Sequence, residues 1–179
     1  MHKIVAIVGM AGAGKSTATE TFMKQEYECI HFGDVTMDEI KRRGLEVNEK
    51  NESMIRESLR KEMGMDAFAK LNEPKIRELV KKKNIVIDGL YSWQEYTYLK
   101  PKFPELIVVA IYASPKTRHH RLGMRKVRPL TPEEAQKRDY AEIENLKKSD
   151  PIALADHTIL NEGSHDNLET ELKNLISRL

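Results

Sequence analysis

A stretch near the start of the chain has the residue types and spacing that bind phosphate groups. Residues 9–16 read Gly-Met-Ala-Gly-Ala-Gly-Lys-Ser, which fits the pattern G-x-x-x-x-G-K-[ST] at every fixed position. Small residues let a backbone wrap closely around an anion, so that its N–H groups point inward. A helix expected to begin near Lys15 adds its positive dipole end. The sequence therefore predicts a phosphate-binding loop between a strand and a helix.

The polar side chains of this loop predict which ligand it holds. Lys15 can reach the β- and γ-phosphates of a nucleoside triphosphate, and the Ser16 hydroxyl can ligate Mg²⁺. Thr17 supplies the next hydroxyl, and we expect it near the α-phosphate. A plain glycine-rich turn is the alternative, but a strand, a lysine, a hydroxyl and a helix would then coincide by chance. The predicted nucleotide-binding residues here are Gly9, Ala11, Gly12, Ala13, Gly14, Lys15, Ser16 and Thr17.

Two carboxylates follow predicted strands and are expected at the same edge of a sheet. Asp88 ends the apolar run Ile85–Asp88 and is followed by Gly89. Beside a phosphate loop, such an aspartate holds Mg²⁺ directly or through water. Asp34 follows Gly33 after the second predicted strand, where it could orient or deprotonate an acceptor hydroxyl. The alternatives are a simple Asp-Gly turn at Asp88 and a helix N-cap at Asp34.

Arginines recur along a predicted helix and the loop that follows it. Arg118, Arg121 and Arg125 are spaced three and four residues apart, so a continuous helix would place them on one face. Arg128 lies in the following loop and Arg138 on the next helix. Phosphoryl transfer spreads negative charge over the moving group, and arginines can clamp it. An exposed basic helix is the alternative interpretation.

Short apolar runs alternate with helical patterns along the chain. The runs are rich in Val and Ile without polar alternation, which is typical of a parallel sheet covered on both faces. The alternation predicts one doubly wound α/β domain over residues 1–179. The predicted strands are Lys3–Val8, Glu28–Phe32, Ile85–Asp88, Leu106–Tyr112 and His157–Leu160. The predicted helices are Ser16–Gln25, Met37–Arg43, Glu52–Lys83 with a break, Trp93–Leu99, Pro115–Arg125, Pro132–Lys148 and His165–Leu179.

Composition narrows the partners that the chain is expected to have. The net charge is +2 and aromatic residues make up 6%, which does not favour nucleic acid as a partner. The single cysteine, Cys29, excludes an intrachain disulfide and fits a reduced cytoplasmic setting. No apolar run approaches the roughly 20 residues of a membrane-spanning helix. We therefore expect a cytoplasmic protein that acts on small molecules away from membranes.

Several segments resemble the P-loop kinases of nucleotides and related small molecules. The likeness covers most of the chain and is closest to dephospho-CoA kinases and adenylate-kinase-related proteins. "IVIDG" resembles the third-strand Asp-Gly of nucleoside monophosphate kinases, and "ASPKTRHHRL" resembles the helix that leads to their lid. "ALADHTILNEGSHDNLETEL" is similar to the carboxyl-terminal pattern of dephospho-CoA kinases, with Asn161 and Gly163 near the adenine of ATP.

The resemblance implies a three-layer P-loop NTPase fold around a five-stranded parallel sheet in the order 2-3-1-4-5. It implies a helical acceptor-binding insert over about residues 34–83 and a short mobile lid near residues 125–130. It also implies transfer of the γ-phosphoryl group of ATP, with Mg²⁺, to a nucleotide-like acceptor. Lys15, Asp34, Arg121 and Arg125 would then be catalytic. The implied acceptor-binding residues are Asp34, Arg56, Arg60, Asp88, Gly89, Tyr91, Arg128 and Arg138.

The sequence departs from that family pattern at two places. After Gly33-Asp34, where these kinases carry an arginine, no arginine appears until Arg42. After Asp88-Gly89, Tyr91 stands where arginine is expected. A tyrosine can stack on a base or donate one hydrogen bond, but it cannot neutralise a phosphate.

Three functions are consistent with these residues. The first is an ATP-dependent kinase whose acceptor is dephospho-CoA or a nucleoside monophosphate. The second is a P-loop NTPase or nucleotide-binding switch without a small acceptor, which Tyr91 favours mildly. The third is a kinase of nucleic-acid ends, which the near-neutral charge and the few aromatic residues disfavour.

Overall fold

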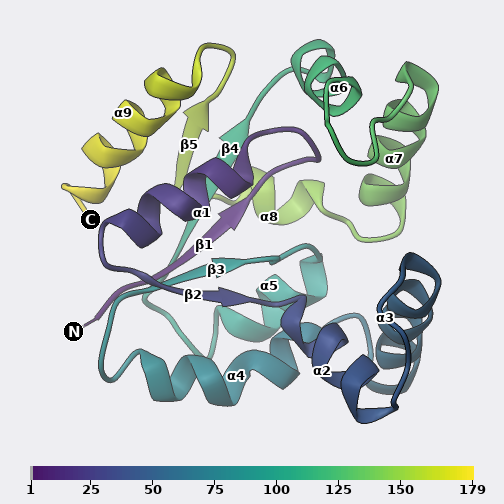
Figure 1. Cartoon of the computed structure of the whole chain (residues 1–179). Helices are drawn as coiled ribbons and strands as arrows, with labels where there is room; N and C mark the ends of the chain where they lie inside the picture. The colour runs from purple at the N-terminus through teal and green to yellow at the C-terminus, as the bar shows by residue number, and fades with distance from the viewer. Residues whose placement is uncertain (1) are drawn as a thin grey trace.

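A parallel sheet forms the centre of the protein (Figure 1). The computed structural model describes residues 2–179. The strands lie in the order β2-β3-β1-β4-β5, and every neighbouring pair is parallel. This confirms the predicted fold class and strand order. The strands are β1 (Ile4–Val8), β2 (Glu28–His31), β3 (Ile85–Asp88), β4 (Leu106–Tyr112) and β5 (His157–Leu160).

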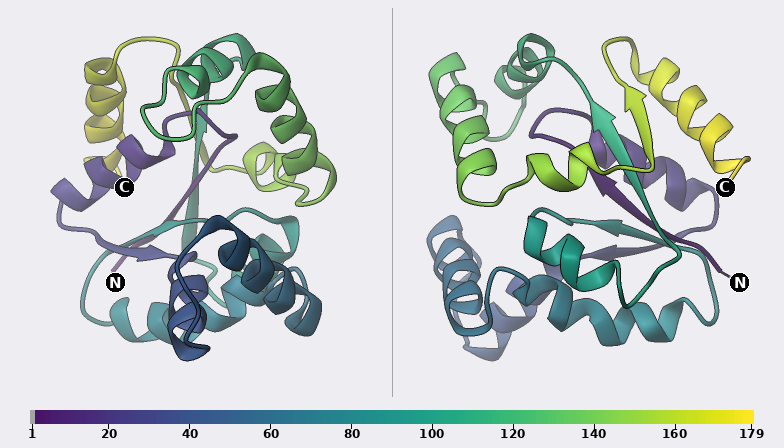
Figure 2. Two further views of the ribbon diagram at one scale, coloured as in Figure 1. Left: turned by 45° about the vertical axis from the view of Figure 1, so that its right-hand side comes forward. Right: turned by 180° about the vertical axis from the view of Figure 1, so that it is seen from behind.

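Strand β1 lies between β3 and β4 and is buried along its whole length. Its alternate residues pack into two separate apolar cores, because successive side chains of a strand point to opposite faces. Ile4 belongs to one core, which includes residues of the helices α4 (Ala67–Leu79) and α5 (Trp93–Leu99). Val5 belongs to the other, which includes residues of α1 (Lys15–Lys24) and α9 (His165–Ile176). The sheet is therefore the middle layer of three, as the two views of Figure 2 show.

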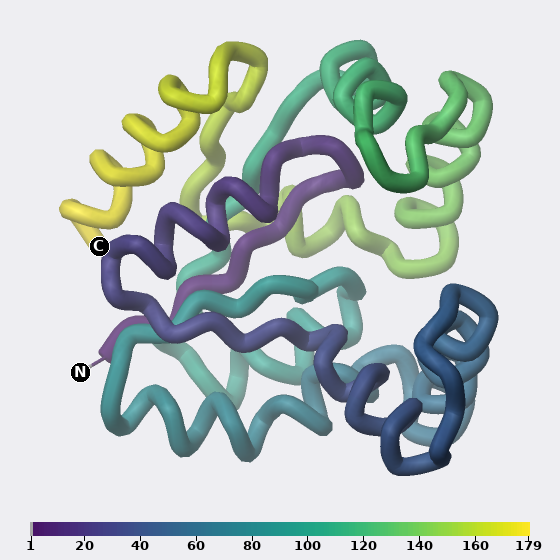
Figure 3. The backbone as a smooth tube through the Cα atoms, viewed as in Figure 1, coloured from purple at the N-terminus to yellow at the C-terminus, as the bar shows by residue number. Residues whose placement is uncertain are grey.

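Most of the remaining helices gather beyond the carboxyl ends of the strands, whereas α8 packs against β4 and α5. In the backbone trace of Figure 3, the loop after α6 turns toward α3. An ion pair between Arg128 in that loop and Glu49 of α3 joins the two segments. The loop and the helical insert therefore meet over the carboxyl edge of the sheet. The remaining helices are α2 (Asp34–Arg42), α3 (Glu49–Met63), α6 (Pro115–Gly123), α7 (Pro132–Glu144) and α8 (Ser149–Ala153).

The insert between β2 and β3 contains α2, α3 and α4. The predicted break in its long helical segment falls at Gly64, whose φ of 96° ends α3. Helix α3 begins earlier than predicted because the Asn48 side chain caps it by accepting the N–H of Asn51. Helix α2 also begins earlier than predicted. Gly33 occupies its N-cap position, so Asp34 lies in the first turn and the N-cap interpretation of Asp34 is wrong.

Several predicted helices end earlier than expected, and the differences at α6 and α7 affect the site. Helix α6 stops at Gly123, so Arg125 lies in the following loop and does not share a helix face with Arg118. Helix α7 stops at Glu144, not at Lys148. Lys147 then adopts a left-handed backbone with φ of 52°, which no α-helix accommodates. The chain turns there and begins the short, unpredicted helix α8.

The loop after β3 is held by a buried carboxylate from α5. Glu95 is 1% exposed, and its Oε2 accepts the N–H of Tyr91 at 2.7 Å and that of Ser92 at 2.9 Å. The Ser92 hydroxyl in turn accepts the N–H of Glu95, which completes a capping box. This arrangement fixes the backbone between Asp88 and the start of α5. Burial raises the pKa of Glu95 to about 7.

We predict that Glu95 makes stability depend on pH. A carboxyl whose pKa rises from 4.5 to about 7 on folding stabilises the fold at low pH. That contribution, about 3 kcal/mol when complete, is lost as pH rises through 7. Urea unfolding gives the free energy of unfolding at about pH 5 and at about pH 8. This free energy should fall less between the two pH values for Glu95→Gln than for the wild type. The exposed Glu105→Gln is the control, and an equal fall for Glu95→Gln and the wild type would contradict the prediction.

Candidate active site

The glycine loop approaches its neighbours more closely than any larger residue would allow. A Cβ atom on Gly9 would lie 2.5 Å from the carbonyl oxygen of Ile111. One on Gly14 would lie 2.4 Å from Asn161 Nδ2, and the φ of Gly14 is +105°. These two glycines therefore permit both the backbone conformation and the close packing that place the loop over β4 and β5.

Side chains from distant elements hold the loop in this shape. Arg118 donates from Nη1 to the carbonyl oxygen of Ala11 at 3.1 Å. Asn161 donates from Nδ2 to the carbonyl oxygen of Ala13 at 2.8 Å. The ammonium of Lys15 donates to the carbonyl oxygen of Met10 at 3.1 Å. Three side chains therefore hold the backbone of the loop in place, and one of them is the loop's own lysine.

A cavity of about 520 Å³ opens above the loop, and we call it the phosphate-loop cavity. It brings together Lys15 and Ser16 from the loop with Asp88 from the end of β3. The helical insert, the loop after α6 and the helix α7 complete its walls. Its lining residues are Ala11, Gly12, Lys15, Ser16, Glu49, Glu52, Arg56, Arg60, Asp88, Tyr91, Arg125, Arg128, Arg138, Glu142, Leu146 and Lys148.

The charges in this cavity are arranged around one buried carboxylate. Glu142 accepts the backbone N–H of Ala11 at 3.1 Å and lies 2.9 Å from the ammonium of Lys148. Arg138 donates to its other oxygen at 3.3 Å. Burial opposes ionisation of Glu142, but the charges of Lys148 and Lys15 outweigh burial and lower the pKa of its carboxyl. Burial, reinforced by Lys148, lowers the pKa of Lys15 to about 7.

A second pocket of about 210 Å³ lies on the other side of the loop. Arg121 lines it and donates to Asn161 Oδ1 at 3.4 Å and to the carbonyl oxygen of Gly163 at 3.3 Å. Gly14 and Thr17 complete the side next to the loop. The structure therefore brings Arg121, Asn161 and Gly163 together, as the sequence predicts, but places Arg121 apart from Arg125 and Arg138.

Most other predicted site residues line the phosphate-loop cavity, and the exceptions are Gly9 and Ala13 of the loop, Asp34 and Gly89. Asp34 is exposed and is not among the cavity's lining residues, so its role toward an acceptor stays a prediction. Gly89 is buried behind the cavity, where its φ of +105° turns the chain after Asp88. The Oδ2 atom of Asp88 lies 3.2 Å from Nδ1 of His31, a neighbour that the sequence did not reveal.

Five residues of the cavity were missed by sequence reasoning, namely Glu49, Glu52, Glu142, Leu146 and Lys148. Of these, Glu142 and Lys148 are the buried charged residues. Glu142 sits in a helix whose other acidic residues are mostly exposed, and nothing in its neighbours distinguishes it. Lys148 follows another lysine, a pattern typical of a solvated helix end. Lys148 points inward because the chain turns at Lys147. The spacing of residues along the sequence therefore did not indicate that Lys148 is buried.

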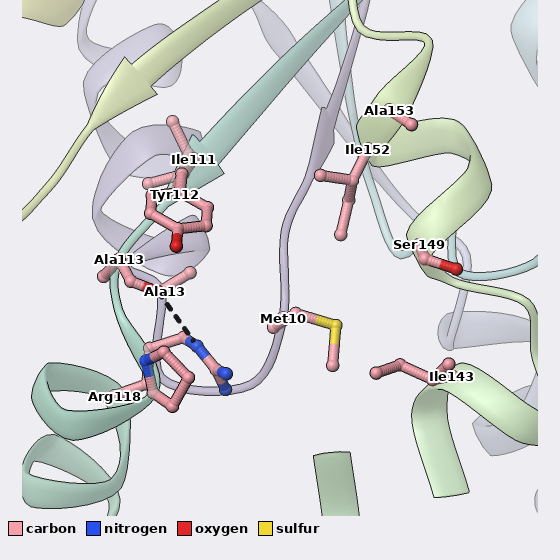
Figure 4. A pocket seen from close by; sticks show the side chains of 11 residues that line it. Met10, Ala13, Ile111, Tyr112, Ala113, Arg118, Ile143, Ser149, Ile152 and Ala153 are labelled. Atoms are coloured by element: carbon pink, nitrogen blue, oxygen red, sulfur yellow. Dashed lines mark hydrogen bonds between the residues drawn. The ribbon is translucent and has the colours of Figure 1, made fainter. Parts of the chain in front are cut away.

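The structure also contains an apolar cavity of about 250 Å³ behind the loop (Figure 4). Met10 and Ala13 of the loop line one side, and Ile143 and Ile152 line the other. Arg118 borders this cavity while donating from Nε to the carbonyl oxygen of Ala113 at 3.1 Å. Its lining is mainly apolar and shares no residue with the lining of the phosphate-loop cavity, so the two cavities are separate.

The residues present fit Mg²⁺ bound together with a nucleotide. Magnesium prefers hard oxygen ligands and is commonly held by one or two protein groups plus substrate phosphates. The Ser16 hydroxyl and the Asp88 carboxylate supply such oxygens in the phosphate-loop cavity. Within residues 2–179, no group of three or more His, Cys, Asp and Glu side chains could hold a metal by itself. The donor set therefore suits a metal that arrives with phosphate.

Comparison with solved structures defines the fold class. Shikimate kinase from Bacteroides thetaiotaomicron matches with a TM-score of 0.63 at 17% identity, over 98% of each chain. A gluconokinase from Sinorhizobium meliloti matches with a TM-score of 0.59 at 17% identity, over 99% of this chain and 92% of that one. At such identities the likeness shows the fold. The fold is that of the P-loop kinases, which confirms the predicted relationship to their superfamily.

Sequence comparison identifies the family. Residues 5–142 match the profile of a family described as an AAA domain. The UPF0200 protein of Thermococcus gammatolerans is 36% identical over 181 residues, covering 98% of this chain and 95% of that protein. The UPF0200 protein of Methanocaldococcus jannaschii is 35% identical over 182 residues, covering 98% and 90%. The chain therefore belongs to the AAA domain family and to the UPF0200 family of these relatives.

None of the helices described over residues 2–179 has both the length and the apolar character that a membrane span requires.

We predict that Gly14→Ala destabilises the loop by more than backbone strain alone. Gly44, with a φ of +64° and open space around its Cβ position, supplies the control, Gly44→Ala. Both variants should lose about 1–2 kcal/mol from the left-handed backbone. Gly14→Ala should lose more, because its methyl group displaces Asn161 from Ala13. Urea unfolding measures both losses, and equal losses would show that the close approach is unimportant.

Proposed function

We propose that the protein is an ATP-dependent small-molecule kinase that transfers the γ-phosphoryl group of Mg-ATP to an anionic, nucleotide-like acceptor. One observation carries the proposal. The phosphate-loop cavity combines Lys15 and Ser16 with arginines from the helical insert, from the loop after α6 and from α7. A nucleotide-binding site alone would not need that second set of cations on the opposite wall. Dephospho-CoA and nucleoside monophosphates are the leading acceptor classes, from the sequence resemblance.

The nucleotide would span the glycine loop from one pocket to the other. The second pocket would receive the base beside Arg121 and Asn161, and the phosphates would follow the loop toward Lys15. Thr17 lies in the second pocket, which supports its expected place near the α-phosphate. The backbone N–H groups at the start of α1 and its positive dipole end would stabilise the phosphate charge.

Mg²⁺ would be held by the Ser16 hydroxyl and the Asp88 carboxylate, together with phosphate oxygens. When bound, it supplies positive charge that neutralises the β- and γ-phosphates. The chain's own residues supply the remaining charge and orientation. Lys15 would place an ammonium against the same phosphates, and Arg125 and Arg138 would face the transferred group from the opposite wall of the cavity.

The acceptor would lie against the insert, where Arg60 lines the cavity. Arg60 forms no ion pair within residues 2–179, and its buried Nε atom has no hydrogen-bond partner there. Its guanidinium packs over the ring of Phe68 at 5.1 Å, which holds the side chain in place. A half-buried guanidinium without a partner favours an anionic ligand such as a phosphate or carboxylate.

The loop after α6 would act as the lid. Its Arg128 pairs with Glu49 at the start of α3, so the lid and the insert already touch across the cavity. A closed lid excludes water from the γ-phosphoryl group and so disfavours wasteful hydrolysis. The neighbours in fold include proteins named shikimate kinase and gluconokinase, which supports a small-molecule acceptor.

A nucleotide-dependent switch without an acceptor is the second candidate. Tyr91 favours it, since a tyrosine in place of arginine removes one charge from the acceptor wall. Two features argue against it. The cavity retains Arg56 and Arg60 on the insert, and it has a lid that meets that insert.

An acceptor panel separates the two candidates. Purified protein with Mg-ATP is given AMP, CMP, UMP, deoxynucleoside monophosphates or dephospho-CoA, and ADP formation is followed together with the phosphorylated product. We expect at least one acceptor to yield product in equal amount to ADP. Slow ATP hydrolysis with no product from any of these acceptors would favour the switch.

We predict that Lys15→Met abolishes phosphoryl transfer and leaves the fold intact. The loss of an ammonium that faces the phosphates should reduce turnover at least roughly a hundredfold, the scale seen when one charge-stabilising donor is removed. Thermal melting should remain close to that of the wild type, because Lys15 donates only to Met10 within its own loop. Lys116→Met, at an exposed site on α6, is the control. Retained turnover in Lys15→Met would refute the assigned role.

A further inference from the structure

Lys148 is a buried lysine whose position the proposed reaction does not yet use. It immediately precedes α8 and is only 3% exposed. Its ammonium lies 4.5 Å from the ring centroid of Tyr91 and 2.9 Å from Glu142. Lysine is almost never fully buried without a partner or a task, because removing its charge from water is costly.

Tyr91 and Lys148 lie together at one wall of the phosphate-loop cavity. The tyrosine brings no charge, but the face of its ring attracts a cation. Lys148 supplies that cation from a different part of the chain, and both residues line the phosphate-loop cavity. This wall of the cavity therefore carries a positive charge that the ring of Tyr91 helps to hold in place.

Glu142 occupies the donors that an anion would use. Its two oxygens receive the N–H of Ala11, the ammonium of Lys148 and the Nε–H of Arg138. Two cations share this single carboxylate, so the group keeps a net positive charge. A carboxylate held by these donors shows that the wall recognises an anionic oxygen group.

We propose that Lys148, held on the ring of Tyr91, binds an anionic group of the phosphoryl acceptor, a phosphate or a carboxylate. The inference rests on the proposed function, since it concerns the acceptor side of the same cavity. Glu142 favours the charged form of Lys148, against the burial that lowers the pKa of this lysine. The bonds of Glu142 to Arg138 and Ala11 would remain when Lys148 reaches toward the ligand. Lys148 is then a substrate-binding residue of this chain.

The test measures anion binding to the protein saturated with Mg²⁺ and a non-hydrolysable ATP analogue, whose γ-phosphoryl group fills the loop. Inorganic phosphate and acetate are the two probes, one for each acceptor chemistry, and titration calorimetry gives each Kd. The wild type should bind at least one probe. Lys148→Met should weaken that binding at least roughly tenfold, because a desolvated charge contact is lost. Affinity for the ATP analogue should change much less.

Two further variants keep the result interpretable. Lys147→Met removes the exposed neighbouring lysine and should bind the probes as the wild type does. Glu142→Gln/Lys148→Met avoids leaving a buried carboxylate unpaired, so it tests the lysine even where the single variant unfolds. It should also lose probe binding. Probe binding that is absent in the wild type, or unchanged in a folded Lys148 variant, overturns the proposal. Failure of the wild type to bind the ATP analogue instead overturns the proposed function, and this inference with it.

Discussion

The buried guanidinium of Arg118 connects the parts from which the site is built. It forms two hydrogen bonds with Asp139 of α7, at 2.6 and 2.8 Å, and also donates to carbonyl oxygens of Ala11 and Ala113. One side chain thus ties the glycine loop to the end of β4 and to α7. Removing one partner from such a pair costs about 3–5 kcal/mol, because the other charge stays buried. Arg118 therefore fixes where α7 presents Arg138 and Glu142.

The packing of α7 against the glycine loop concentrates positive charge in the phosphate-loop cavity. Cations from α7 and from the loop after α6 share this cavity with those of the insert. Like charges repel, and carboxylates such as Glu49 and Glu142 offset this repulsion by pairing with the cations. The pKa of Lys15, lowered to about 7 mainly by burial, shows how poorly solvated this region is.

The sequence predicted the sheet well because its strands are continuous apolar runs. The bounds of β3, β4 and β5 match the prediction, since each run is flanked by clear polar or turn residues. The phosphate loop and Asp88 were predictable for the same reason, because local spacing defines them. The wall of the cavity formed by Glu142 and Lys148 was less predictable. Lys148 enters it only through the turn at Lys147, and Glu142 only through packing of α7 on the loop, and neither leaves a local pattern.

We infer that the glycine loop and the segment from the loop after α6 to α8 form one ligand site. Hydrogen–deuterium exchange of the full chain, with and without Mg-ATP, tests it directly. With Mg-ATP bound, exchange should slow in two separate segments, residues 9–17 and residues 125–148. Protection confined to the loop, with the second segment unchanged, would contradict the claim that both segments hold the same ligand.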